Sequence, residues 1–87
     1  MIFVDEIKTY EPSKFLRWGK KWSHMWPDGN VEELHQFAEK IGLKREYFQD
    51  KPRFPHYDLI PSKRRQALRN GAKFMPLKDW FKYDRYK

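Results

Sequence analysis

Apolar and polar residues follow one another along the chain in short blocks whose periods predict alternating strands and helices. Residues 2–4 are all apolar and are followed by an acidic pair, the pattern of a buried strand that ends at a polar edge. In residues 22–26 every second position is a tryptophan or a histidine, which predicts a strand with His24 on the same face as two indoles. Two more strands are predicted at 56–60 and 72–75.

The segment 30–42 carries the signals of one well-capped amphipathic helix. Asn30 is a favoured N-cap, and the Glu33 carboxylate is placed to reach back to the N–H group of that cap. Gly42 suits the left-handed position that ends a helix, and Leu43 suits the apolar contact that closes a Schellman turn. The apolar face is made of residues at helical spacing: Leu34, Phe37, Ala38 and Ile41.

Proline and glycine positions predict the remaining helices. Pro61 suits a first helical turn and Gly71 suits the position after a helix end, so residues 61–70 are predicted to be helical. Pro76 opens a last helix near the C-terminus. Two further segments are predicted as a single helical turn and a proline-containing loop: 44–48 and 50–55.

This order of elements predicts the fold class. We expect a small single-domain α/β sandwich over residues 1–87, with a mostly parallel sheet of about three or four strands and about three helices. Between the first two strands the segment 7–21 is predicted as a loop rich in basic and aromatic residues. The charged C-terminal residues 84–87 are predicted to fray.

Composition narrows the class of protein. Aromatic residues make up 18% of the 87 positions, so the core is expected to be rich in rings. The absence of cysteine excludes disulfides, thiolate metal sites and cysteine nucleophiles. No apolar run approaches the ~20 residues that span a bilayer, so we expect no membrane partner and a cytoplasmic location.

The net charge of +7 favours anionic partners such as nucleotides, nucleic acid or an acidic protein face. The basic aromatic segment 7–21 has the composition of a groove for single-stranded nucleic acid, although aromatic rings in a small domain more often belong to the core. The helix 61–70 concentrates further cations, among which Arg65 and Arg69 repel at i,i+4 unless an anion lies nearby. A solvated basic surface explains the same charges without a ligand.

The three histidines and two of the aspartates are the candidates for chemistry. Asp5 ends the first strand, where it serves either as a ligand or as a turn cap. His24 is a ligand or general base if its face of the strand opens on a cleft, and a packed residue otherwise, while His35 lies at the border of the helix's apolar face. His56 and Asp58 share one face of a strand, a spacing that allows a shared metal or an oriented imidazole–carboxylate pair.

Several of these residues belong to motifs that occur in a recognisable order: Phe3-Val4-Asp5-Glu6, Ser23-His24-Met25, Glu32-Glu33-Leu34-His35 through Ala38, Ile41-Gly42, His56-Tyr57-Asp58, Ala67 and Gly71-Ala72. Together they resemble the domain of unknown function 4031 family over most of the chain. The resemblance implies a small protein common in bacteria and their phages, with no established activity, and hence a host cytoplasmic location if the chain is phage-encoded. Because every histidine falls on the family pattern, the resemblance also favours one shared polar cleft.

From these observations we expect a basic accessory protein that binds an anionic ligand, a nucleotide or nucleic acid, in a cleft lined by His, Asp and Arg. The expected ligand-binding residues are Asp5, His24, His35, His56, Tyr57, Asp58, Arg64, Arg65 and Arg69. No catalytic residue is assigned, and assembly into a homo-oligomer is left open.

Two alternatives remain open at the level of the sequence. The first is a metal-dependent phosphodiesterase or nuclease, in which Mn²⁺, Mg²⁺ or Zn²⁺ is the cofactor and arginine stabilises the phosphoryl charge. Its metal ligands would be Asp5, His24, His56 and Asp58. The second is an inhibitor that binds a host protein through exposed aromatic residues.

Overall fold

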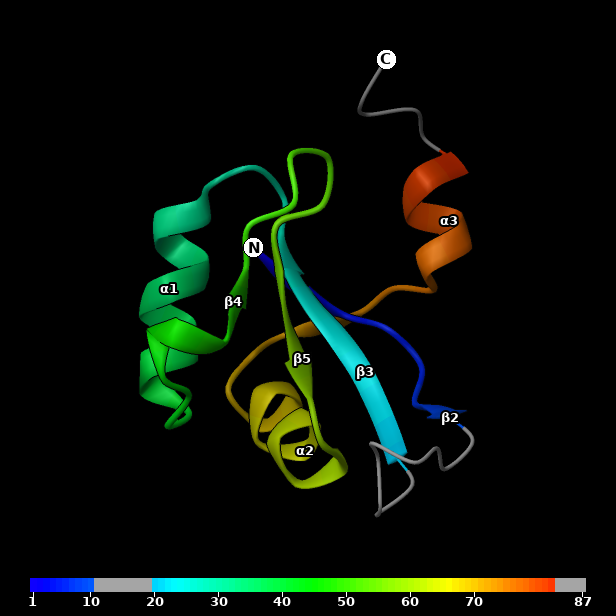
Figure 1. The fold of residues 1–87 in the computed structure, drawn as a ribbon, viewed down its shortest axis with the longest axis horizontal. Coiled ribbons are helices and arrows are strands. Elements are labelled where there is room, and N and C mark those ends of the chain that lie inside the picture. The colour runs from blue at the N-terminus through cyan, green and yellow to red at the C-terminus, as the bar shows by residue number, and fades with distance from the viewer. Residues whose placement is uncertain (11–19, 83–87) are drawn as a thin grey trace.

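The computed structural model of the protein describes residues 1–10 and 20–82, and Figure 1 shows their arrangement. The elements in chain order are β1 (Ile2–Val4), β2 (Lys8–Tyr10), β3 (Lys20–Pro27), α1 (Val31–Lys40), the 3₁₀ turn η1 (Arg45–Tyr47), β4 (Phe48–Gln49), β5 (His56–Leu59), α2 (Pro61–Arg69), β6 (Lys73–Phe74) and α3 (Leu77–Lys82). Predictions that fall on residues 11–19 and 84–87 lie outside the described residues. Within the segment 7–21, residues 8–10 form β2 and residues 20–21 open β3.

The sheet is mixed, so the prediction of a mostly parallel sheet with three or four strands is wrong. Five strands lie in the order β4-β5-β3-β1-β6, and β2 pairs with the first residues of β3. The pairs β1–β3, β3–β5, β4–β5 and β2–β3 are antiparallel, whereas β1–β6 is parallel. The fold is therefore a small α/β domain with a mixed sheet, covered by three helices in its described part.

The helical connections explain this correction. The pairings make β4 parallel to β3 and β6 parallel to β5, so α1 and α2 do join parallel strands as crossover helices usually do. However, β5 lies between β3 and β4, and both β3 and β1 lie between β5 and β6. In each gap the strand next to the one that precedes the helix is antiparallel to it: β5 beside β3, and β3 beside β5. The two-residue β4, which reverses the chain before β5, gives no periodic signal in the sequence.

The predicted capping of α1 is largely confirmed. The Asn30 side chain accepts a hydrogen bond from the Glu33 N–H at 3.1 Å, as an N-cap does. At the other end Gly42 has φ +83°, and the Leu43 N–H donates to the Ala38 carbonyl at 2.9 Å in a Schellman turn. The Glu33 carboxylate does not complete a capping box, because it contacts the Met1 amine instead.

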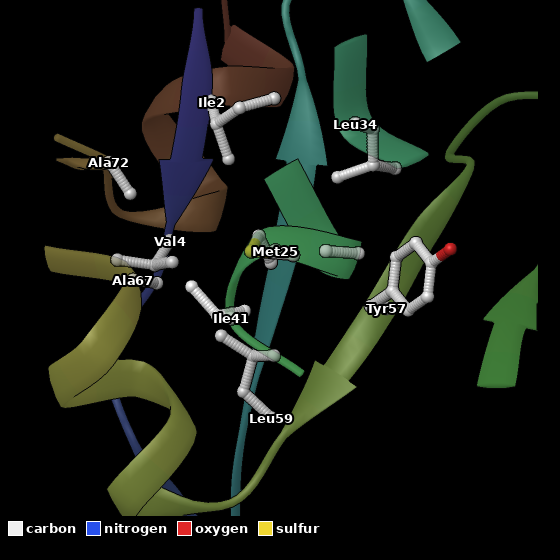
Figure 2. Close-up of a cluster of buried hydrophobic side chains, with 10 residues drawn as sticks. Ile2, Val4, Met25, Leu34, Ile41, Tyr57, Leu59, Ala67 and Ala72 are labelled. Atoms are coloured by element: carbon white, nitrogen blue, oxygen red, sulfur yellow. The ribbon is translucent and has the colours of Figure 1, made fainter. Parts of the chain in front are cut away.

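Two clusters of buried side chains lie on opposite faces of the sheet. Alternation along β1 and β3 sends Val4 and Met25 to one face and Phe3 and Trp26 to the other. The first face packs against α1 and α2, and Figure 2 shows its mostly aliphatic cluster with Tyr57 at one side. The second face packs against Trp80 of α3, and this smaller cluster is aromatic. The expectation of a core rich in rings therefore holds for this face, whereas in the described residues the larger cluster has Tyr57 as the one ring among its buried members.

No helix in residues 1–10 and 20–82 is long and apolar enough to cross a lipid bilayer.

Candidate metal centre

Three neighbouring strands bring the predicted site residues together. His24 lies in the middle of β3 directly opposite Asp58 of β5, and His56 precedes Asp58 by two residues on the same strand. Asp5 follows β1, where its N–H donates to the His24 carbonyl at 3.2 Å and extends the pairing of β1 with β3. All four side chains therefore lie on the face of the sheet opposite α1 and α2.

We name the set His24, His56 and Asp58 the metal-binding cluster, because one ligand atom from each lies within 4.8 Å of the other two. The Asp58 Oδ1 is 3.4 Å from the His56 Nε2 and 4.0 Å from the His24 Nε2. Bonds of about 2.0–2.1 Å to one ion place its ligands within roughly 3 to 4 Å of each other. Small side-chain rotations would bring all three atoms into that range.

The other nitrogen of each imidazole already has a partner. The Nδ1 of His56 is 2.7 Å from the Phe54 carbonyl, and the Nδ1 of His24 is 2.9 Å from the Asp5 carboxylate. Carbonyl and carboxylate oxygens only accept hydrogen bonds, so in both neutral imidazoles the proton is on Nδ1 and the lone pair is on Nε2. Zinc-binding histidines are oriented in the same way by backbone carbonyls and carboxylates.

When both imidazoles are neutral, the ligand atoms of the metal-binding cluster are therefore all hydrogen-bond acceptors. Two Nε2 lone pairs and one carboxylate face each other, and such a group is stabilised by a cation placed between them, either a proton or a metal ion. When His56 carries a proton on Nε2, its hydrogen bond to Asp58 holds the pKa of that carboxyl below its ordinary value. The positive charges of His56 and His24 lower the pKa of Asp58 further, against the opposing effect of burial.

Asp5 contacts the cluster through His24. Its carboxylate is fully buried, and one oxygen accepts the His24 backbone N–H while the other contacts the His24 Nδ1. Its carbonyl accepts a hydrogen bond from the Arg64 Nε at 2.9 Å. Arg64 itself lies over the exposed Phe74 ring. Because both carboxylate oxygens of Asp5 contact His24, Asp5 orients the imidazole of His24. Asp5 is not one of the three residues whose ligand atoms converge, so its predicted role as a metal ligand is not supported.

Exposure differs across the cluster. The side chain of Asp58 is 42% exposed, that of His24 is 22% exposed and that of His56 is 11% exposed. The Phe54 ring stacks on His56 and meets His24 edge-on, with centroid distances of 4.7 and 5.7 Å. The cluster is thus covered on the Phe54 side and open beside Asp58, which is where a ligand has access.

His35 and Tyr57, two other predicted site residues, lie on the opposite face of the sheet. The His35 Nδ1 is 2.8 Å from the Tyr57 hydroxyl, and both rings contact Phe48. Burial lowers the pKa of His35, helped by the nearby positive charge of Arg45, and burial raises the pKa of Tyr57. Both side chains are therefore neutral near pH 7, and their hydrogen bond joins α1 to β5.

The basic residues of α2 separate into two groups. Arg64 is partly buried and holds the backbone beside the cluster, as described above. Arg65 and Arg69 are exposed on α2. The structure therefore brings His24, His56 and Asp58 together, places Asp5 and Arg64 behind them, and leaves the remaining predicted residues elsewhere.

Sequence reasoning missed Phe54. It contributes a backbone carbonyl to His56 and a ring to the wall of the cluster. A carbonyl contact has no side-chain signature, and residues 50–55 showed only the prolines of a loop. The one available signal was that Phe54 precedes His56 by two residues.

A model of the family described as "Protein of unknown function (DUF4031)" matches residues 2–86, nearly the whole chain. No curated protein matches the chain, and no solved structure does.

Proposed function

The chain belongs to the DUF4031 family, and from the geometry of its metal-binding cluster we propose that it binds a divalent metal ion and hydrolyses a phosphoester ligand held by that ion. The observation that carries the proposal is the convergence of the His24 Nε2, the His56 Nε2 and the Asp58 carboxylate. In each imidazole the Nδ1 is already bound to an oxygen acceptor, which directs the Nε2 lone pair at the shared space.

The donor set indicates the class of metal. Two imidazoles with one carboxylate suit Zn²⁺ and other first-row ions, whereas Mg²⁺ prefers oxygen ligands. Three protein ligands leave at least one coordination position for water or substrate, as in catalytic zinc sites. We expect Zn²⁺ to bind more tightly than Mn²⁺, and Mn²⁺ more tightly than Mg²⁺.

The chemistry follows from an open metal position in a basic protein. A metal ion held by the cluster would lower the pKa of a water molecule and polarise a phosphoryl oxygen. Attack of that water on phosphorus would break the P–O ester bond, and the proton that the water loses would balance the one that the leaving oxygen takes up to give an alcohol. The net charge of +7 favours the approach of phosphate-containing substrates.

Metal binding is tested first, by titrating the chelator-treated protein calorimetrically with Zn²⁺ and Mn²⁺. Asp58→Ala suits this test because its side chain is 42% exposed, so its loss leaves no large cavity. Loss of a residue that only orients a ligand costs roughly 10- to 100-fold in metal affinity, so we expect Asp58→Ala and His56→Gln, which remove ligands themselves, each to weaken Zn²⁺ binding by at least that much. His35→Gln is the matched control, since it removes a histidine from the other face of the sheet. Equal Zn²⁺ affinity in all variants would refute the metal site.

Hydrolysis is tested separately with the Zn²⁺-loaded and Mn²⁺-loaded protein. The substrates are an activated phosphodiester, cyclic nucleotides and a short single-stranded oligonucleotide, with products identified by mass spectrometry. Product that requires both the metal and Asp58 supports the enzyme. Metal-dependent binding with every ligand recovered intact would refute hydrolysis and leave the alternative of an anion-binding protein without turnover.

A further inference from the structure

A cavity of about 520 Å³ adjoins the metal-binding cluster, and Asp58 belongs to both. We name it the Asp58 cavity. Its volume lies within the range of about 300–1,000 Å³ that is usual for small-molecule sites. Its apolar and aromatic lining residues are Trp22, Leu43, Tyr47 and Ile60.

The strands fix the position of the cavity relative to the cluster. Trp22 precedes His24 by two residues on β3, and Ile60 follows Asp58 by two residues, so both lie one step further along the same face. That step is roughly 7 Å. Among the described strands, β4 pairs only with the first two residues of β5, which leaves the edge open where the cavity extends towards Leu43 and Tyr47.

Lys63 adds a fixed positive charge to the cavity wall. Its ammonium group donates to the Ile41 carbonyl at 2.7 Å and to the Gln66 side chain at 3.3 Å. These bonds hold the charge in one place at the junction of α1 and α2. A ligand in the cavity therefore meets aromatic surface, the Lys63 cation and the Glu46 carboxylate. It lies next to a site that is suited to a metal-bound anion.

We propose that the Asp58 cavity holds the base of a free nucleotide whose phosphate is bound at the metal-binding cluster. Flat heterocycles stack on aromatic side chains such as Trp22 and Tyr47. A nucleotide joins such a ring to a phosphate across one sugar, a spacing comparable to the two-residue strand step from Trp22 to His24. The position of the phosphate rests on the proposed function, whereas the base site rests on the cavity alone.

Calorimetry with the Zn²⁺-loaded protein tests this inference with the four ribonucleoside 5′-monophosphates, their nucleosides, ribose 5-phosphate and a ten-nucleotide single strand. We expect at least one mononucleotide to bind about 10-fold more tightly than ribose 5-phosphate. Tyr47→Ala should abolish that preference and leave the affinities for Zn²⁺ and ribose 5-phosphate unchanged. Tyr47 is 53% exposed, so its truncation is not expected to unfold the domain.

Leu68→Ala is the control, because this exposed apolar residue of α2 is not among those that line the Asp58 cavity. The inference is overturned if no mononucleotide binds more tightly than ribose 5-phosphate, or if the preference survives in Tyr47→Ala. Tighter binding of the oligonucleotide than of every mononucleotide would also overturn it, in favour of a nucleic acid end.

The base site can also be tested if the proposed metal centre proves wrong. If the protein takes up no metal, nucleosides are titrated directly into the metal-free chain. Nucleoside binding that is weakened by Tyr47→Ala would uphold the base site while refuting the metal centre. Absence of any nucleoside or nucleotide binding would refute the base site itself.

Discussion

At the scale of single residues, the buried Asp5 determines how His24 is presented. Both of its carboxylate oxygens contact His24, one through the backbone N–H and one through the Nδ1. Its own carbonyl is held by Arg64. A carboxylate in this position keeps the imidazole proton on Nδ1 and so keeps the Nε2 lone pair on the side of Asp58.

Asp5→Asn is therefore expected to weaken Zn²⁺ binding by about 10- to 100-fold, because an amide can donate to the Nδ1 and favour the opposite tautomer. The measurement is a calorimetric titration, with circular dichroism to confirm that the fold is retained. Asp50→Asn, at an exposed loop position, serves as the control. An unchanged affinity in a folded Asp5→Asn variant would mean that Asp5 does not orient His24 for a metal.

His35 is expected to make folding stability depend on pH. Burial lowers the pKa of His35 in the folded chain, so the unfolded chain binds more protons as the pH falls. The free energy of unfolding should therefore be retained above the unfolded pKa of about 6.5 and decrease as the pH falls below it. Denaturant unfolding between pH 8 and pH 5 measures this decrease.

The contribution of His35 is obtained by difference, because the measured pH dependence is that of the whole chain. In His35→Gln the decrease in unfolding free energy should be smaller than in the unsubstituted chain. A decrease of equal size in both proteins would show that the pH dependence does not arise from the His35–Tyr57 pair.

At the scale of elements, α1 is stabilised mainly by its ends and by one buried face. Leu34 and Ala38 are fully buried, while the N-terminus depends on Asn30 and the C-terminus on Gly42. These features are local in the sequence. They lie on the face of the sheet opposite the metal-binding cluster. A substitution in α1 should therefore change the free energy of unfolding without changing the affinity for metal.

Asn30→Ala is expected to lower the free energy of unfolding by about 1 kcal/mol, because the Glu33 N–H loses its acceptor. Urea unfolding measures the change, and Zn²⁺ affinity should remain as in the unsubstituted chain. Ser62→Ala is a suitable control, since Ser62 lies inside the first turn of α2, after its N-cap Ile60. A parallel loss of Zn²⁺ affinity in Asn30→Ala would indicate coupling between the two faces.

At the scale of the whole molecule, the excess of positive charge should affect the rate of ligand association. Arg65 and Arg69 are exposed on α2 and are not members of the metal-binding cluster. Replacing both with glutamate changes the formal charge from +7 to +3, since each substitution removes two units. Long-range attraction of an anion weakens accordingly and is screened by salt.

The double variant Arg65→Glu, Arg69→Glu should therefore bind phosphate-containing ligands with a lower association rate and a flatter dependence on ionic strength. The dissociation rate and the affinity for Zn²⁺ should change little. Stopped-flow measurements at low and high salt provide both rates, and Lys82→Glu with Lys78→Glu on α3 is a control of equal charge. Identical association rates in both double variants would assign the effect to net charge and not to α2.

The sequence by itself determined much of the local structure. The apolar run 2–4, the alternation at 22–26 and the Asn30 to Gly42 signals each specify an element through neighbouring residues, and the structure contains all three. Alternation also predicted that His24 shares a face with its flanking tryptophans and that His56 shares a face with Asp58. Such features depend on periods of two or 3.6 residues, which are visible along the chain.

Only the tertiary structure decided which elements become neighbours. The sheet order places His24 opposite Asp58 and brings Asp5 behind His24, through pairings between residues far apart in the sequence. It also assigns His35 and Tyr57 to the other face, and it reveals the Phe54 carbonyl as the partner of His56. The direction of strand pairing depends on the packing of the whole domain. For that reason the local pattern indicated candidate site residues, whereas the tertiary structure showed that His24, His56 and Asp58 are the three that converge.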